Sequence, residues 1–141
     1  MTLILDSSGL LSAVNTDQRL HQAAKEALER AAGPLVLSPF VLAELDYMIL
    51  TRYGPDEELA SLDEVARGVY RLAPFSTEDI AETQAIIEHY TGFGNVGLAD
   101  ASNVVPAERY GTRDILTLDE RHFRAIHGPQ GRPLRLLPAD L

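Results

Sequence analysis

Residues 2–11, TLILDSSGLL, decide the fold that we expect for this chain. The run that opens this stretch is short and apolar and is closed by an acid, which predicts a buried strand ending at the carboxylate of Asp6. Ser7-Ser8-Gly9 follows at once, and the apolar residues up to Val14 predict a short helix with a serine near its cap. A buried strand that passes directly into a helix is typical of an α/β unit.

The rest of the chain continues this alternation of strand and helix. We predict strands at residues 2–6, 35–37, 69–72, 114–117 and 134–137. We predict helices at residues 7–14, 17–32, 38–53, 56–67, 76–90, 98–110 and 119–125. Because the strands are too short and apolar for a one-sided sheet, helices should cover both faces of a mostly parallel sheet. The predicted fold class is α/β, a three-layer α/β/α sandwich with about four to five strands, formed by residues 1–141 as a single domain.

Local signals mark the ends of several helices. Gly33-Pro34 stops the amphipathic helix 17–32, and Ser38-Pro39 suits the N-cap and first positions of the next one. An acidic first turn at residues 76–79 complements the dipole of the helix that it opens. Pro106 lies inside the helix 98–110, where we expect it to kink the helix rather than break it.

The composition fits one folded domain and excludes several functional classes. The 141 residues are 45% hydrophobic and contain no cysteine, which rules out disulfide scaffolds, zinc ribbons, iron–sulfur sites and thiol catalysis. No apolar run approaches the roughly 18 residues of a membrane helix, and no signal peptide is visible, so we expect a cytoplasmic protein without a membrane partner. A net charge of −9 argues against non-specific nucleic-acid binding through a basic surface.

Four carboxylates occupy positions that this fold should bring together. Asp6 ends the first strand, and Asp119 follows the strand 114–117. Glu44 and Asp100 lie in early turns of helices, among apolar or small residues where an uncompensated charge is costly. Ligands of parallel α/β sheets bind outside the carboxyl ends of the strands, which is where these acids are expected.

Clustered carboxylates favour a bound cation, because like charges otherwise raise each other's pKa. Mg²⁺ or Mn²⁺ suits such a site, since both are hard cations that take oxygen ligands and keep several waters. A carboxylate-held metal that activates a water is typical of phosphodiester hydrolysis. The acidic net charge is compatible with that chemistry, because the metal, not a basic face, would meet the phosphate.

Three polar residues beside the acids are candidates for holding the carboxylates by hydrogen bonds. Asn103 lies one turn after Asp100 on the same helix face, and Ser7 and Thr117 adjoin the two strand ends. A local turn bond is an equal alternative for Ser7 and Thr117, and capping or packing is the alternative role for Asn103.

The other polar candidates carry weaker signals. The four histidines lack ligand spacing, so we expect surface or packing roles for His21, His89, His122 and His127. Asp46 faces a different side of its helix from Glu44 and is expected to be solvated. An apolar strip on the same helix is expected to belong to the core and consists of Tyr47, Met48, Leu50 and Tyr53.

Four segments in order resemble the PIN-domain ribonucleases, and among them the VapC-type toxins of bacterial toxin–antitoxin pairs. The segments are residues 5–11, 38–46, 97–102 and 115–123, so the resemblance covers essentially the whole chain. It implies a PIN-like sandwich and a metal-dependent endoribonuclease whose catalytic acids correspond to Asp6, Glu44, Asp100 and Asp119. Of these, Asp6, Asp100 and Asp119 would hold Mg²⁺ or Mn²⁺. The resemblance also implies a homodimer and a small VapB-type antitoxin that occludes the acidic site.

Other functions remain open at this point. A receiver-like signalling domain shares the length and the acidic pocket, but it needs a lysine after the fifth strand, and the only lysine is Lys25. A haloacid-dehalogenase-type phosphatase needs a second aspartate where this chain has Ser8. A non-catalytic PIN-like module that only binds a partner protein is the alternative from a different class, and loss of one of the four acids would mark it.

Overall fold

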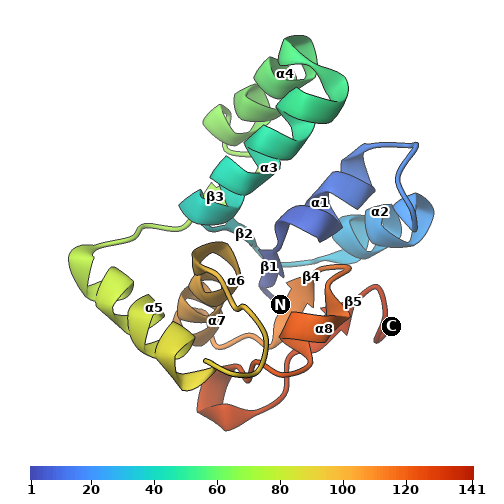
Figure 1. Ribbon diagram of the computed structural model, residues 1–141. Helices are drawn as coiled ribbons and strands as arrows, with labels where there is room; N and C mark the ends of the chain where they lie inside the picture. Colours follow the sequence, from blue (N-terminus) through green and yellow to red (C-terminus); the bar gives the residue numbers. More distant parts are fainter.

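The computed structural model describes residues 1–141 (Figure 1). Its strands are β1 (Leu3–Leu5), β2 (Leu35–Leu37), β3 (Arg71–Leu72), β4 (Asp114–Leu116) and β5 (Arg135–Leu137). Its helices are α1 (Ser7–Val14), α2 (His21–Arg30), α3 (Pro39–Tyr53), α4 (Pro55–Ala66), α5 (Thr77–His89), α6 (Leu98–Ser102), α7 (Val104–Arg109) and α8 (Glu120–Phe123). A 3₁₀ turn, η1 (Pro129–Gly131), precedes β5.

The five strands form one sheet in the order β3-β2-β1-β4-β5, and every neighbouring pair is parallel. The α/β prediction is confirmed, and the sheet is entirely parallel. From β1 the chain builds β2 and β3 on one side, then crosses back to build β4 and β5 on the other. The order therefore reverses between β1 and β4, which is where open parallel sheets place their binding sites.

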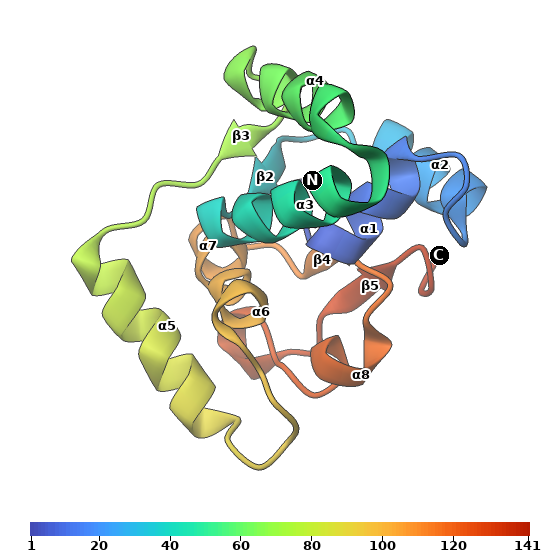
Figure 2. The same ribbon diagram turned by 45° about the horizontal axis from the view of Figure 1, so that its top comes forward.

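Each face of the sheet has its own apolar layer, because successive side chains of a strand point to opposite faces. Leu5 and Leu37 pack with α1, α2 and α3 on one face. Ile4 and Val36 pack with α6, α7 and α8 on the other. Figure 2 shows α3 lying in front of α1, with α2 beside α1 and with α5, α6 and α7 on the other side of the molecule. Burial on both faces explains why the strands are continuous apolar runs.

A close approach between α1 and β4 sets the geometry at the carboxyl end of the sheet. A Cβ atom on Gly9 would lie 2.3 Å from the backbone oxygen of Leu116, so only glycine fits there. The contact places the first turn of α1 beside the end of β4, where the hydroxyls of Ser8 and Thr117 are 3.2 Å apart.

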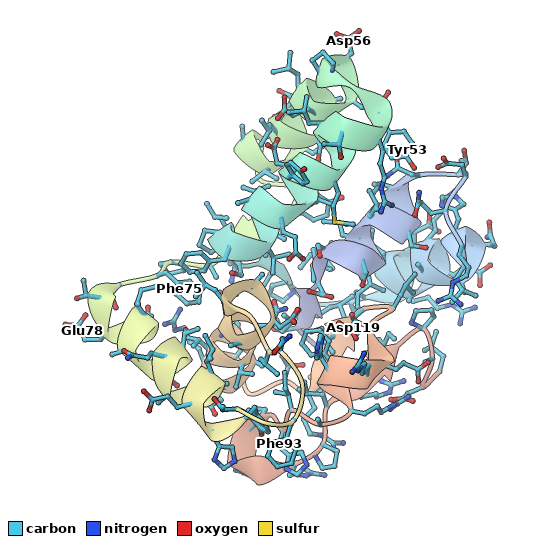
Figure 3. The ribbon with its side chains drawn as sticks, viewed as in Figure 1. Tyr53, Asp56, Phe75, Glu78, Phe93 and Asp119 are labelled. Atoms are coloured by element: carbon cyan, nitrogen blue, oxygen red, sulfur yellow. The ribbon has the colours of Figure 1, made fainter.

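The helix predicted at residues 17–32 begins later, at His21. Residues 15–20 form turns instead, and Leu20 has a left-handed conformation with φ of 60°. Hydrogen bonds from outside this segment hold the turns in place: Tyr53 Oη donates to Asp17 Oδ1, and Ser12 Oγ donates to the carbonyl oxygen of Arg19. Tertiary bonds therefore override the helical periodicity, and the position of Tyr53 is visible in Figure 3.

The edge strand and the proline-containing helix also differ from the prediction. The strand predicted at 69–72 is reduced to Arg71–Leu72, both of which are exposed at the sheet edge. The helix predicted at 98–110 divides into α6 and α7 at Asn103, because Pro106 has no N–H to bond the carbonyl four residues earlier. Asn103 keeps right-handed dihedrals, φ −67° and ψ −26°, so the helical path continues through a kink, as predicted.

The α3–α4 hairpin packs on the molecule through one side of α3 and through Val65 of α4. Gly54, with φ of 92°, lies where the chain leaves α3 and Pro55 begins α4, which has no buried residue. The prediction that the strip on α3 belongs to the core is half wrong. Met48 and Tyr53 pack against the core, but Tyr47 is 68% exposed and Leu50 is 40% exposed.

Asp46, expected to be solvated, faces the carboxyl group of Glu58 on α4. Asp46 Oδ1 is buried without a hydrogen-bond partner. The neighbouring Asp46 carboxyl raises the pKa of Glu58. None of the helices is both long and apolar enough to cross a membrane.

Candidate metal centre

Asp6 lies directly after β1 at the centre of the sheet's carboxyl end and is only 2% exposed. Thr117 Oγ1 donates to its Oδ2 at 2.7 Å, and Ser8 Oγ donates to the same oxygen at 3.3 Å. Asn103 Nδ2 donates to Oδ1 at 3.2 Å. One buried carboxylate is thus fixed by side chains from three places: α1, the α6–α7 junction and the end of β4.

Burial dominates the electrostatics of Asp6. Desolvation raises the pKa of its carboxyl to about 7, against an opposing hydrogen bond from Thr117. The charges of Asp100 and Glu44 raise the pKa further. Both charged groups that shift the pKa of Asp6, namely Asp100 and Glu44, have the same sign as its carboxylate.

Asp100 and Asp119 approach each other from α6 and from the start of α8. Asp100 lies in the first turn of α6, with a side chain that is 18% exposed. Desolvation raises its pKa to about 6, and the charges of Asp119 and Glu44 act in the same direction while His122 opposes them. Asp119 caps α8 by accepting from the backbone N–H of His122, and Figure 3 shows it at the edge of α8 that faces the middle of the molecule.

Glu44 is the most open of the four acids. The sequence suggested apolar surroundings for it, but the residue is exposed on α3. Its Oε1 accepts a hydrogen bond from Ser7 Oγ at the start of α1. Its charge still contributes to the raised pKa of both Asp6 and Asp100, so it lies beside them at the rim of the site.

The three polar residues proposed as carboxylate holders each bond a candidate acid. Ser7 bonds Glu44, while Asn103 and Thr117 bond Asp6. Thr117 Oγ1 also accepts from the backbone N–H of Asp119, so one hydroxyl joins two of the acids.

Sequence reasoning missed two side chains of the site, His122 and Ser8. His122 Nδ1 lies 2.8 Å from Asp119 Oδ2 and 3.4 Å from Asp100 Oδ2. The sequence held one signal for His122: it lies three residues after Asp119 at the start of a helix, and residues three apart share a helix face. Ser8 Oγ accepts from the backbone N–H of Leu118 as well as contacting Asp6 and Thr117, and nothing in the sequence distinguished it from Ser7.

The donor set fits a divalent cation. Ligand atoms from Asp100, Asp119 and His122 lie within 4.8 Å of one another. Asn103 Oδ1 is buried next to Asp6 and accepts no hydrogen bond, which leaves a further oxygen for a cation or its water. A cation here would also remove the mutual repulsion that raises the pKa of Asp6 and Asp100.

The family model of the PIN domain matches residues 3–128, which is most of the chain and includes all four acids. The chain therefore belongs to the PIN-domain family. Within that family it is a homologue of a VapC ribonuclease: it is 43% identical to "Ribonuclease VapC26" of Mycobacterium tuberculosis over 136 residues, or 96% of this chain and 100% of the relative.

Two solved structures share the fold at low sequence identity. VapC20 of Mycobacterium tuberculosis, described as a toxin that cleaves the sarcin–ricin loop, superposes with a TM-score of 0.76 at 16% identity, covering 83% of this chain and 89% of that one. VapBC2 of Rickettsia felis, crystallised with a DNA fragment from its promoter, gives a TM-score of 0.67 at 19% identity, covering 96% and 98%. Both likenesses confirm the PIN-like sandwich.

The family assignment also decides between the alternatives left open by the sequence. A receiver-like domain is no longer favoured, and Lys25 lies on α2, where it pairs with Glu29 at 3.9 Å. A non-catalytic PIN module would lack part of the acidic set, whereas this chain brings its four acids to one end of the sheet.

Proposed function

We propose that the protein is an endoribonuclease that depends on Mg²⁺ or Mn²⁺ and acts as the toxin of a toxin–antitoxin pair. The observation that carries this proposal is the convergence of Asp6, Asp100, Asp119 and Glu44 around a shared space, in a chain homologous to a VapC ribonuclease. Buried like charges are costly, so a cluster of this kind is best explained by a cation that binds there.

The metal ligands in this proposal are Asp6, Asp100 and Asp119. A bound Mg²⁺ or Mn²⁺ supplies an activated water and neutralises charge on the scissile phosphate. Thr117 and Asn103 keep the Asp6 carboxylate in one orientation, because they bond its two oxygens separately. Glu44 is the acid most open to solvent, so it is the one that an entering phosphodiester backbone meets first.

The expected reaction is hydrolysis with in-line attack of water on phosphorus. Attack by water makes the 2′-hydroxyl unnecessary, so the products should carry a 5′-phosphate and a 3′-hydroxyl. We expect the cut in a single-stranded or loop region of RNA, where the backbone bends into a narrow acidic site.

The test combines metal dependence with analysis of the product ends. EDTA should stop cleavage of a loop-containing RNA, and excess Mn²⁺ should restore it. The fragments should accept a 5′ label only after phosphatase treatment. Cleavage that survives EDTA, or fragments that end in a 2′,3′-cyclic phosphate, would refute the carboxylate–metal mechanism.

The proposed protein partner is a small VapB-type antitoxin, and the apolar surface around α3 and α4 supports its docking there. A hollow of about 100 Å³ lies between α1, α3 and α4, with Leu45, Ile49 and Tyr70 in its wall. On other faces of the same two helices, Tyr47 and Leu59 are 68% and 63% exposed. An arginine or lysine of the antitoxin would enter the acidic site, because the carboxylates attract cationic groups.

Mixing the purified protein with the product of the adjacent reading frame should abolish cleavage and raise the melting temperature. Full activity in a saturated complex would overturn this assignment of the partner. We also propose that the toxin is a homodimer, and light scattering of the isolated protein tests this directly: a mass near 31 kDa, twice the 15.4 kDa chain, is expected.

A further inference from the structure

His122 is the third member of the group formed with Asp100 and Asp119, although no part of the proposed mechanism uses it. Its Nδ1 is 2.8 Å from Asp119 Oδ2 and 3.4 Å from Asp100 Oδ2. The imidazole lies between the two carboxylates, where an Nδ1–H donates to Asp119. One nitrogen therefore faces the same space as two of the proposed metal ligands.

Two contacts fix the orientation of this ring. The backbone N–H of His122 donates to Asp119 Oδ1 at 3.1 Å, so the residue is held in the first turn of α8. The loop before α6 passes the other edge of the ring, and this loop lies near α8 in Figures 1 and 2. The Cβ position of Gly94 in that loop is 3.6 Å from His122 Cδ2 and 3.7 Å from Nε2. Nε2 thus faces the loop, and Nδ1 faces the carboxylates.

The spacing of these donor atoms suits a common cation. Adjacent ligands of an octahedral ion with bonds of about 2.1 Å lie roughly 3 Å apart. The two distances from Nδ1, 2.8 and 3.4 Å, lie on either side of that value. The nitrogen requires no large movement to bind an ion together with the two carboxylates.

We propose that His122 Nδ1 is a direct ligand of the divalent cation, alongside Asp100 and Asp119. Imidazole nitrogen suits the transition metals better than Mg²⁺, so a mixed nitrogen and oxygen site selects Mn²⁺ over Mg²⁺. This inference rests on the proposed function, because it concerns the same cation. It adds a ligand and a metal preference that an all-carboxylate site does not have.

Pulsed electron paramagnetic resonance of the wild-type protein loaded with Mn²⁺ tests the ligand directly. Coupling of the Mn²⁺ electron spin to a directly bound ¹⁴N should modulate the echo, and protein labelled with [¹⁵N]histidine should show the ¹⁵N pattern instead. Bound Mn²⁺ without histidine coupling would overturn the inference, and His122 would then only position Asp119 by hydrogen bonds.

A variant pair tests the metal preference. His122→Asn keeps an amide donor at the position of Nδ1, so it preserves the bond to Asp119 while removing the imidazole. We expect its Kd for Mn²⁺ to rise about tenfold or more, a usual cost for losing a group that supports a metal site, while its Kd for Mg²⁺ changes little. His127→Asn is the matched control, because His127 is exposed and its ring has no hydrogen bond.

The results also separate this inference from the proposed function. Equal loss of Mg²⁺ and Mn²⁺ affinity in His122→Asn, or no loss of either, would overturn the metal preference while leaving the carboxylate site intact. If wild-type protein bound no Mn²⁺, or if Asp100→Asn bound it equally well, the carboxylate site would fail, and the assignment of His122 with it. The inference that His122 is a ligand would be supported if His122→Asn lost the coupling of histidine nitrogen to Mn²⁺ while His127→Asn kept it.

Discussion

The carboxyl end of the sheet and the α3–α4 hairpin depart from an ordinary protein surface in opposite ways. At the sheet, charged groups are buried: Asp6 is 2% exposed, and its pKa is raised to about 7. On the hairpin, apolar groups are exposed: Tyr47 and Leu59 are 68% and 63% accessible, and α4 buries no residue. Both arrangements are unfavourable in an isolated chain, and we attribute the first to a cation and the second to a protein partner.

The comparison shows which of the two functions, cation binding or partner binding, depends on residues that also hold the core together. The acidic end is built from the central strands and a network of side-chain bonds around Asp6, so a change there alters stability and activity together. The hairpin meets the core through one side of α3 and through Val65 of α4, so a change on its open face alters only what binds there. The predictions below test that separation, from the largest expected effect to the smallest.

Gly9→Ala should prevent folding or leave only a small folded fraction. The added Cβ would lie 2.3 Å from the Leu116 oxygen and 2.7 Å from the Thr117 nitrogen, both backbone atoms of the central sheet. Circular dichroism and yield of soluble protein measure the effect. Gly97→Ala is the control for stability, because its φ is −90° and no atom lies within 4 Å of the added methyl group. Native-like melting of Gly9→Ala would contradict the close packing of α1 on β4.

Asp6→Asn, Glu44→Gln and Asp100→Asn should each reduce metal-dependent RNA cleavage by about 10²-fold or more, as removal of a key electrostatic group usually does. An amide supplies no anionic oxygen to the cation. Initial rates of cleavage with Mg²⁺ measure the loss. Asp46→Asn on the same helix as Glu44 should cleave normally, because Asp46 faces Glu58 rather than the acid cluster. Wild-type rates for Asp6→Asn would show that the site assignment is wrong.

The metal-free protein should become less stable as the pH rises from 3.8 to about 7. In that interval the folded state holds a proton on Asp6 that the unfolded state has lost, so ionisation favours unfolding. Asp100 acts in the same direction up to about pH 6. The stabilisation that the protonated Asp6 carboxyl contributes is complete below pH 3.8 and is lost above the raised pKa of Asp6. Urea denaturation in EDTA should show the decline, and Asp6→Asn should flatten it; a stability that rises through this range would exclude the raised pKa of Asp6.

Replacing an exposed apolar residue of the hairpin should have the smallest effect on the chain itself. Tyr47→Ser or Leu59→Ser should change the free energy of unfolding by no more than about 0.5 kcal/mol and leave cleavage intact, because both side chains are exposed. Binding of the antitoxin, measured by titration calorimetry, should weaken. If these variants bound the antitoxin as tightly as wild type, the partner would dock on another surface.

The sequence was informative where the core determines the structure. Asp6 could be placed because it closes an apolar strand at the centre of a parallel sheet, and Thr117 could be placed because it ends the neighbouring strand. The start of α5 could be placed from its acidic first turn, and the structure adds a reciprocal capping box between Ser76 and Asp79 at that point. In these cases local pattern and tertiary packing favour the same answer.

The sequence was less informative where contacts between distant residues decide. The turns at residues 15–20 depend on bonds from Tyr53 and Ser12, which periodicity does not report. Tyr47 is 68% exposed on α3, although apolar spacing alone suggested a core position. His122 enters the site through the first turn of α8, a short helix that is capped by Asp119 itself.

We propose that the carboxyl end of the sheet gives up stability in order to bind a cation. A pair of melting curves tests this most directly. Wild type and Asp6→Asn should be melted at pH 7.5, first in EDTA and then with excess Mn²⁺. The amide can be accommodated, because the hydroxyls of Ser8 and Thr117 that bond Oδ2 can accept as well as donate.

In EDTA, Asp6→Asn should melt at a higher temperature than wild type, because a buried charge has been removed. With Mn²⁺, wild type should gain stability and Asp6→Asn should gain little, since only a ligand bound by the folded state raises the melting temperature. With Mn²⁺, the melting temperatures of the two proteins should therefore converge, or wild type should melt at the higher temperature. An unchanged wild-type melting temperature in Mn²⁺, or an equal rise in both proteins, would contradict the account.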